Sequence, residues 1–366
     1  HCISSAASDV YKRQVYNLLD KMQLYNKLSN EERATLIKKA NEKRLTLSFY
    51  KYHRIKNVEV FRNYLFTNFN NLNILGRIYV ASEGINSQLS IPSKKMGELK
   101  SFLDSIYFLK DIRLNVGIEH HNESFLKLKI KIKDKIVADG LKAKDYDMNN
   151  SGTHVNAKDF NVLLEKPETI TIDMRNHYES EVGHFKGAVC PDVDTFRDSL
   201  PLIYKKFKHA KENNILMYCT GGIRCEKASS YLKKNGFKNV FQLSGGIIEY
   251  ARQIKEVGIE NKFVGKNFVF DNRLGERISN EIIAKCHVCG EECDRHVNCN
   301  NEACHVLFIQ CEKCYKELDG CCSNSCKDIY ALPVDKQKKI RKGYKNRTRF
   351  FKKGRLSCLL YTSDAA

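Results

Sequence analysis

The residues best suited to chemistry lie in one short segment, residues 219–225, which reads Cys-Thr-Gly-Gly-Ile-Arg-Cys. An apolar run precedes this segment and an amphipathic pattern follows it, so it is predicted to join a buried parallel strand to the N-terminus of a helix. In an α/β sheet, ligands bind at this end of the strands. Because the loop amides and the helix dipole favour negative charge, Cys219 is expected to ionise easily and to react as a thiolate.

Arg224 is the second candidate catalytic residue of this loop. Its spacing from Cys219 is Cys-x4-Arg, which resembles the active-site loop of rhodaneses, whereas a cysteine phosphatase needs one residue more to surround a phosphate. We expect the Arg224 guanidinium to face an anion and to hold thiolate and substrate; a salt bridge that fixes the loop is the alternative. Cys225 is interpreted as a small buried residue or, alternatively, as a thiol that resolves an oxidised Cys219. The other supporting loop positions are Thr220, Gly221, Gly222 and Ile223.

Further motifs around this loop occur in the order and spacing typical of a rhodanese domain. Asp173-x-Arg175 ends a predicted strand, residues 183–188 read Gly-His-Phe-Lys-Gly-Ala, and residues 243–246 read Leu-Ser-Gly-Gly before a helix. Strands that alternate with helices predict a parallel sheet, so residues 151–275 are assigned to an α/β domain that resembles rhodanese. Asp173 and Arg175 are expected to support the loop by pairing with each other and with loop backbone.

A cysteine-rich segment within residues 276–335 holds ten of the fifteen cysteines. In a cytoplasmic protein this density indicates metal ligands rather than disulfides. Two Cys-x2-Cys pairs, separated by some twenty residues, suit one tetrahedral zinc site made of Cys286, Cys289, Cys311 and Cys314. A second site could draw on Cys293, His296, Cys299, Cys304, Cys322 and Cys326. Structural zinc is the expected cofactor; an iron–sulfur cluster or redox thiols are the alternatives.

The elements expected before the rhodanese-like domain predict a separate α+β domain over residues 22–150. Strand patterns alternate with helical ones in the order β-α-β-β-α-β, which is the ferredoxin-like arrangement. The expected strands are 45–52, 76–82, 86–91 and 125–132, and the expected helices are 58–69 and 94–108. Residues 83–86 connect the two middle strands, either as a plain hairpin turn or as a loop that contacts substrate.

The charge of the chain predicts a polyanionic partner. Its formal net charge is +19 and its isoelectric point is about 9.2, which favours nucleic acid. The basic tail, residues 336–356, is the expected contact, because its Lys and Arg side chains could neutralise phosphates. Its aromatic residues Tyr344, Phe350 and Phe351 could stack on unpaired bases. A solvated tail without a partner is the alternative.

The two ends of the chain show no sign of folded structure in the sequence. Residues 1–21 and 357–366 join no periodic pattern and resemble translated adapter sequence, so neither is expected to contribute to function.

The hydropathy of the chain bears on its location in the cell. The sequence holds no apolar run of the roughly 18 residues that a transmembrane helix needs and no signal-peptide pattern. We therefore expect a cytoplasmic protein with no membrane partner.

Four segments in this order resemble one family, the bacterial rhodanese-containing tRNA uridine hydroxylases. They are residues 76–86, 219–227 (Cys-Thr-Gly-Gly-Ile-Arg-Cys-Glu-Lys), 307–311 (Leu-Phe-Ile-Gln-Cys) and 320–323 (Gly-Cys-Cys-Ser). The resemblance implies a monooxygenase-like oxidoreductase that uses molecular oxygen to hydroxylate C5 of the wobble uridine in tRNA. It also implies that the partner is the anticodon region of tRNA and that the loop cysteine is essential.

The sequence leaves the chemistry of Cys219 open between several hypotheses. Its thiolate could add to C6 of uracil and so activate C5, or it could carry an oxidised or persulfide form. No Gly-rich stretch follows the strand–GxGxxG–helix pattern, so neither a flavin nor a nicotinamide site is expected. Two other functions remain as alternatives: a rhodanese-type sulfurtransferase with a persulfide on Cys219, and a non-enzymatic RNA-binding adaptor.

Overall fold

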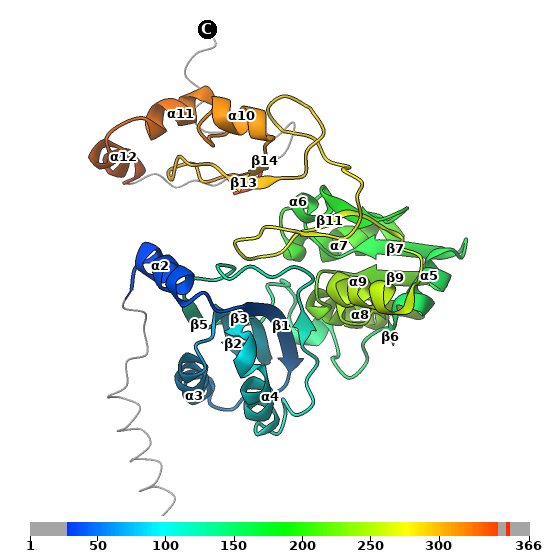
Figure 1. Cartoon of the computed structure of the whole chain (residues 1–366). Helices are drawn as coiled ribbons and strands as arrows, with labels where there is room; N and C mark the ends of the chain where they lie inside the picture. Colours follow the sequence, from blue (N-terminus) through cyan, green and yellow to red (C-terminus); the bar gives the residue numbers. More distant parts are fainter. Residues whose placement is uncertain (1–27, 343–348, 352–366) are drawn as a thin grey trace, which may run out of the picture. The chain divides into compact units, whose positions relative to one another are not determined.

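The structure is a computed structural model that describes residues 28–342 and 349–351 (Figure 1). The chain forms two compact units that divide between Val137 and Ala138. The ends expected to be foreign, residues 1–21 and 357–366, lie outside the described residues. None of the described helices is both long and apolar enough to cross a membrane.

The first unit is an α+β domain built on one five-stranded sheet. Its strand order is β4-β1-β3-β2-β5, and β2 and β5 are parallel while the other neighbours are antiparallel. The elements are α2 (Asn30–Ala40), β1 (Arg44–Tyr52), α3 (Val58–Asn71), β2 (Leu75–Ala81), β3 (Gly84–Pro92), η1 (Ser93–Lys95), α4 (Met96–Asp104), β4 (Asn115–Val116) and β5 (Leu128–Ile132).

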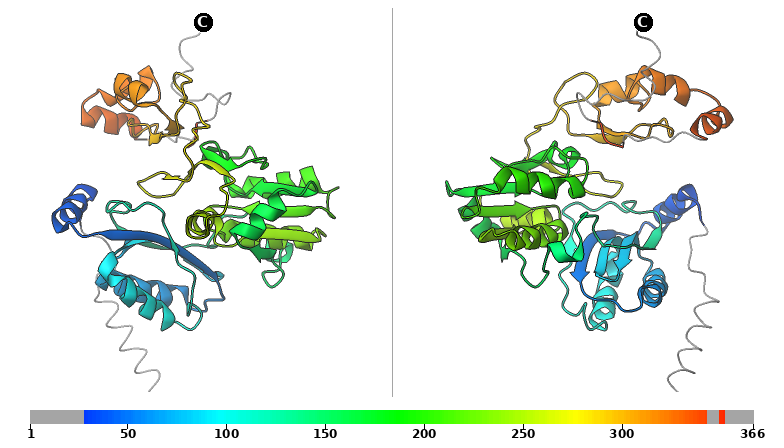
Figure 2. Two further views of the ribbon diagram at one scale, coloured as in Figure 1. Left: turned by 45° about the vertical axis from the view of Figure 1, so that its right-hand side comes forward. Right: turned by 180° about the vertical axis from the view of Figure 1, so that it is seen from behind.

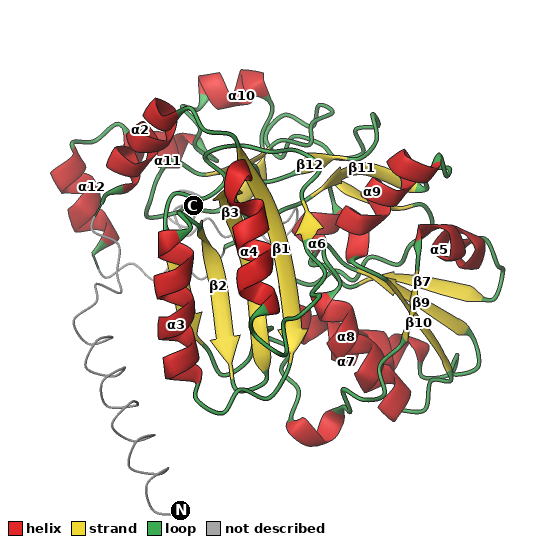
Figure 3. Ribbon diagram, turned by 60° about the horizontal axis from the view of Figure 1, so that its bottom comes forward, coloured by secondary structure: helices red, strands yellow, loops and turns green. Residues whose placement is uncertain are grey.

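This domain has the expected β-α-β-β-α-β order, except that two strands, β4 and β5, follow the last helix instead of one. A single last strand is expected at 125–132, whereas the structure pairs the short β4 with β1 and places β5 at the opposite edge, beside β2. Helices α3 and α4 cover one face of the sheet (Figure 3), where Phe69 and Leu99 join the core with strand residues such as Ile78. Residues 82 and 83 form the turn between β2 and β3.

The second unit contains a parallel sheet in the order β6-β10-β9-β7. Its central strand β9 reads Asn-Ile-Leu-Met-Tyr, and the last four side chains are buried, as a strand covered on both faces requires. Helices α5 and α9 pack on one face and α7 and α8 on the other (Figure 3). The elements are η2 (Ala143–Asp145), β6 (Thr153–Val155), α5 (Ala157–Leu164), β7 (Thr169–Asp173), α6 (His177–Ser180), β8 (Gly183–Phe185), α7 (Phe196–Phe207), β9 (Asn214–Tyr218), α8 (Ile223–Lys234), β10 (Asn239–Leu243) and α9 (Gly246–Val257).

The rest of the second unit consists of a small sheet and the cysteine-rich segment. The small sheet has the order β12-β11-β8, with β11 (Phe263–Asn267) and β12 (Glu276–Arg277). In the cysteine-rich segment, a two-stranded sheet lies against short helices (Figure 2). These elements are β13 (His296–Asn298), β14 (Leu307–Ile309), α10 (Glu312–Glu317), α11 (Asn324–Tyr330) and α12 (Val334–Arg341).

Residues 138–150, which the sequence analysis places in the first domain, lie in the second unit. Helix α8 holds them: the Ser230 hydroxyl donates to the carbonyl oxygen of Asp147 at 2.5 Å. The ammonium of Lys227 also pairs with the carboxylate of Asp139 at 3.4 Å, and both side chains are fully buried. The segment before the parallel sheet is thus fastened to the helix that begins at the cysteine loop.

Candidate active site and metal centres

The loop of residues 219–225 joins β9 to α8, as its pattern predicts. Gly222 has a φ of +101° and precedes the first residue of α8. Its amide donates to Sγ of Cys219 over 3.1 Å. Gly246 has a φ of +67°, and a Cβ there would lie 2.5 Å from the carbonyl oxygen of Cys219. The glycine pair at 245–246 therefore lets helix α9 begin directly against the cysteine loop.

Cys219 is 1% exposed, and its surroundings favour the thiolate. Burial alone raises the pKa of the thiol. The side chain of Cys225, the charge of Arg224 and the loop amides outweigh this effect and lower the pKa of Cys219 to about 6. Burial, and next the hydrogen bond to Cys219, raise the pKa of Cys225, which therefore stays protonated and donates. At neutral pH the site holds a thiolate beside a thiol.

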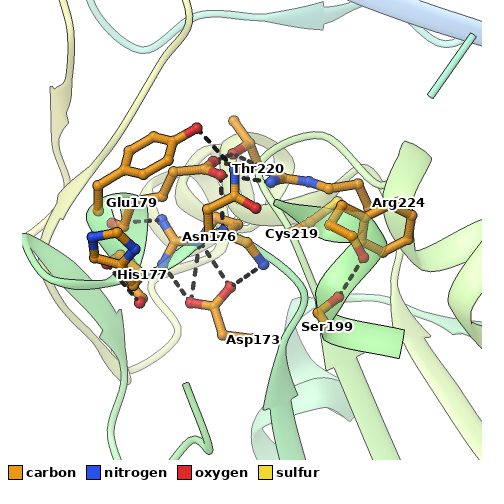
Figure 4. A network of polar contacts seen from close by, with 12 residues as sticks. Asp173, Asn176, His177, Glu179, Ser199, Cys219, Thr220 and Arg224 are labelled. Carbon is orange, nitrogen blue, oxygen red and sulfur yellow. Dashed lines mark hydrogen bonds and ion pairs between the residues drawn. The ribbon is translucent and has the colours of Figure 1, made fainter. Parts of the chain in front are cut away.

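Arg224 forms a buried ion pair, the alternative that the sequence analysis left open (Figure 4). Its two terminal nitrogens contact the two carboxylate oxygens of Glu179 at 2.6 and 2.8 Å. Burial lowers the pKa of Arg224, but the carboxylate of Glu179 outweighs burial and raises it. The guanidinium still contributes positive charge at Cys219. A catalytic role for Arg224 stays a prediction.

Asp173 and Arg175 lie behind the loop and pair with each other. Both side chains are fully buried, and Nη2 of Arg175 lies 2.6 Å from Oδ2 of Asp173. Arg175 also donates to the carbonyl oxygen of Gly183 at 2.5 Å. It thus ties the end of β7 to β8, while the amide of Asn176 donates to Glu179 and caps α6. This frame sets the position of the carboxylate that holds Arg224.

Phe350 and Phe351, which are expected to stack on nucleotides, are half-buried and each contact one ring of the protein. The Phe350 ring stacks on Tyr178 at 3.9 Å between centroids, and the Phe351 ring stacks on His287 at 4.3 Å. Backbone hydrogen bonds hold Phe350 from both sides: the amide of Leu307 of β14 donates to the carbonyl oxygen of Arg349, and the amide of Phe351 donates to the carbonyl oxygen of Leu307. One face of each half-buried ring is therefore occupied by another side chain of the protein, and stacking of these rings on unpaired bases stays a prediction. Tyr344 lies outside the described residues.

Several residues near the loop were missed by sequence reasoning. Glu179, the partner of Arg224, was not identified from the sequence. Phe270 was not noted at all, and its half-buried ring lies 5.9 Å from Cζ of Arg224. No spacing along the chain links Phe270 to the cysteine loop; only the contact in space identifies it.

The cysteine-rich segment contains two groups of four cysteines that can each hold a metal ion. In each group the Sγ atoms lie within 4.8 Å of one another. Tetrahedral zinc with Zn–S bonds of about 2.3 Å requires S–S distances of roughly 3.8 Å. One pair of sulfur atoms in each group fits this distance: 3.6 Å separates Cys289 from Cys311, and 3.7 Å separates Cys304 from Cys322. The groups are Cys286, Cys289, Cys311 and Cys314, and Cys299, Cys304, Cys322 and Cys326.

Cys293 and His296, two of the expected ligands, belong to neither group. Cys293 is buried in a hydrophobic cluster and accepts a hydrogen bond from the amide of Arg295. His296 packs edge-on against Phe268 at 5.0 Å. Burial, and next the charges of neighbouring side chains, lower the pKa of His296 to about 3, so the ring is neutral. The structure places these two side chains in the core beside the metal groups.

Comparison with known families gives three matches along the chain. Residues 44–136 match the UPF0176 acylphosphatase like domain, residues 156–253 match the Rhodanese-like domain, and residues 264–327 match the Rhodanase C-terminal family. With the observed sheets, these matches confirm the predicted multidomain α+β and α/β fold, including the rhodanese-like parallel sheet.

Curated relatives match nearly the whole chain. A Leptospira interrogans protein is 48% identical over 349 residues, which is 95% of this chain and 93% of the relative. A Photorhabdus laumondii protein is 47% identical over 91% of this chain and 95% of its own length. A Yersinia pestis protein is 48% identical over 91% and 94%. All three relatives carry the name tRNA uridine(34) hydroxylase.

Proposed function

The chain belongs to the tRNA uridine(34) hydroxylase family, and from this premise we propose that Cys219 is the catalytic residue of the hydroxylation. The protein is an oxidoreductase that hydroxylates uridine 34, the wobble nucleotide of tRNA. The observation that carries the proposed role is a thiolate with a pKa of about 6 at the end of a parallel strand. A buried cysteine without a chemical role would need neither the Gly222 amide nor a neighbouring thiol donor.

The proposed reaction begins with addition of the Cys219 thiolate to C6 of uracil. The electron pair of the C5–C6 double bond moves toward C5, which then attacks an electrophilic oxygen derived from O2. Loss of the C5 proton and expulsion of the thiolate restore the double bond. Insertion of one oxygen atom from O2 consumes two electrons and two protons from an external donor and releases the other atom as water.

Cys219 needs no further base for the first step, because it is already ionised at neutral pH. The amide of Gly222 and the thiol of Cys225 hold the sulfur in place before attack and can receive it again after expulsion. Arg224 contributes positive charge while Glu179 keeps it in position. The residues of the loop therefore stabilise the leaving thiolate as well as the attacking one.

A sulfurtransferase is the second candidate, because the Cys-x4-Arg loop also suits a persulfide on Cys219. Such an enzyme would form thiocyanate from thiosulfate and cyanide. The third candidate, a non-enzymatic RNA-binding adaptor, would not need an ionised cysteine and predicts that Cys219 is dispensable.

We propose zinc as the metal of both four-cysteine groups. Four thiolates at tetrahedral spacing suit zinc and leave no coordination position open, which indicates a structural role. Short chain segments that bury few apolar side chains gain folding free energy from such ions. The proposed partner is the anticodon region of tRNA, because it contains nucleotide 34, and the proposed compartment is the cytoplasm.

Mass spectrometry of tRNA nucleosides tests the proposed function. Cells that lack the protein should lose 5-hydroxyuridine, and the wild-type chain should restore it. Cys219→Ser should restore none, while Cys190→Ser should restore it fully, because the half-buried Cys190 lies outside the loop. Wild-type levels with Cys219→Ser would exclude a catalytic thiolate. Failure of the wild-type chain to restore the nucleoside would exclude the hydroxylase function.

A further inference from the structure

The first-unit sheet has a second face, opposite to helices α3 and α4, that is only half covered. Side chains alternate between the two faces of a strand. Since Ile78 and Val80 of β2 point into the helix-covered core, Arg77 and Tyr79 point to the other face. At one end of that face, Leu75 packs beneath α2. Helix α2 does not cover the other half, where the backbone of Ile136 contacts the side chain of Asn86 and the remaining side chains are half-buried or exposed.

The open half is a regular grid of polar and aromatic side chains, defined by the strand register. In one row, Tyr79 lies opposite Lys131 of β5 on one side and opposite Asn86 of β3 on the other. Asn86 lies in turn opposite Tyr50 of β1. The next row of the same face contains Lys129, Arg77, Gln88 and Ser48. We call these eight residues the open sheet face.

The two tyrosines of the open sheet face are spaced like platforms for separate bases. Tyr50 and Tyr79 both flank Asn86, so two strand spacings, about 10 Å, separate them. Both rings are half-buried, so each keeps part of its surface accessible. The ammonium of Lys133 lies 5.9 Å from the centre of the Tyr79 ring, which adds a cation beside the platform.

Charge on this surface has one sign. Arg77, Lys129 and Lys131 are exposed, and none of the eight residues is acidic. Cations around accessible aromatic rings are the chemistry that binds single-stranded nucleic acid: the cations neutralise phosphates and the rings stack on bases. Two amide side chains lie between them. That of Asn86 donates to the carbonyl oxygen of Ile136 at 3.1 Å, whereas that of Gln88 is half-buried, and an amide group can donate and accept hydrogen bonds at base edges.

We propose that the open sheet face binds unpaired nucleotides of the tRNA substrate. This inference rests on the proposed function for the identity of the RNA, but it assigns the binding to the acylphosphatase-like domain instead of the basic tail. A protein partner would favour an apolar or mixed-charge surface, and these eight residues include no aliphatic side chain. The occupant is therefore RNA with unstacked bases.

Binding of a labelled anticodon stem–loop RNA to the full chain tests the proposal. Stacking of one base on an aromatic ring contributes about 1–3 kcal/mol, so Tyr79→Ala should raise the Kd about 5- to 150-fold. Tyr79→Phe keeps the ring and should bind nearly as wild type. Tyr107→Ala is the matched control, because Tyr107 is 77% exposed but packs against Phe108 in the helix layer; its Kd should not change.

The salt dependence of binding tests the cations separately. The double variant Lys129→Ala/Lys131→Ala should reduce the slope of log Kobs against log salt by about 1.4, at roughly 0.7 for each single-strand phosphate contact. Lys100→Ala, an exposed lysine on α4, should leave the slope unchanged. Both side chains of the double variant are exposed, so folding is not at risk; melting temperatures check this for every variant.

The outcomes distinguish failure of the proposed RNA-binding surface from failure of the proposed hydroxylase function. Unchanged Kd and salt slope in the Tyr79 and lysine variants would overturn the proposal, even if the wild-type chain forms 5-hydroxyuridine. Weakened RNA binding in these variants supports it, even if hydroxylation by the wild-type chain fails. An equal loss of affinity for a fully duplex RNA in Tyr79→Ala would also overturn it, because paired bases cannot stack on the ring.

Discussion

Replacement of Cys225 by alanine should make Cys219 markedly harder to ionise. The fall in the pKa of Cys219 from an ordinary 9.0 to about 6 corresponds to roughly 4 kcal/mol in favour of the thiolate. A hydrogen bond to a charged group contributes about 1.5–3 kcal/mol. Loss of the Cys225 thiol should therefore raise the pKa of Cys219 by about one to two pH units. Cys225→Ser keeps a donor at the same place and should hold the pKa near 6.

The assay is the rate of Cys219 alkylation by iodoacetamide as a function of pH, read from the mass of the peptide that contains this residue. Site-specific detection is needed because the described residues include thirteen cysteines, none of which is in a disulfide. In the wild type, the thiolate is protonated as the pH falls, so the rate should drop through about pH 6. At pH 7, the ionised fraction should fall from about nine tenths in the wild type to between a half and a tenth in Cys225→Ala.

Cys190→Ala is the control for this experiment, since burial raises the pKa of that thiol to about 12 and it lies outside the loop. Its alkylation profile at Cys219 should match the wild type. If Cys225→Ala also keeps its midpoint near pH 6, the thiol donor has no part in ionising Cys219. The loop amides and Arg224 would then have to account for the whole effect.

Two further predictions concern the ion pair of Arg224 and the two four-cysteine groups. Glu179→Gln leaves the buried Arg224 without its carboxylate and should lower the free energy of unfolding by about 3–5 kcal/mol in urea; an unchanged midpoint would show that the pair is not needed for stability. Cys314→Ser and Cys326→Ser should each lose about one equivalent of bound zinc, measured by elemental analysis, because each belongs to a different four-cysteine group. Cys293→Ser should lose none, and a loss there would mean that the groups are assigned incorrectly.

Local patterns carried the main conclusions about fold class. The cysteine loop could be identified from residues 219–225 alone, because a strand, two glycines and a helix start are adjacent in the sequence. The alternation of strands and helices likewise predicted the parallel sheet, since hydrophobic periodicity is a local property. The order of elements in the first domain was predicted, but the placement of the two edge strands of its sheet was not. The edge strand β4 has only two residues, which are too few to produce a periodic signal.

Assignments that depend on distant residues could not be made this way. The partner of Arg224 is Glu179, 45 residues earlier, and charge alone could not tell an anion-facing guanidinium from a paired one. In the cysteine-rich segment, ten cysteines and three histidines allow many sets of four. The two Cys-x2-Cys pairs already predicted the first set, but only the positions of the Sγ atoms selected the second set and left out Cys293 and His296.

The sequence by itself predicted a rhodanese-like loop with a cysteine that should ionise easily, an α+β domain, a metal-type cysteine segment and a basic tail. The tertiary structure decided what surrounds them: Glu179 beside Arg224, Phe350 against Tyr178, and a grid of tyrosines and cations across neighbouring strands. The reason is physical. Propensity and periodicity act between residues close in the chain, whereas ion pairs, ring stacking and strand register depend on segments that meet only when the chain folds.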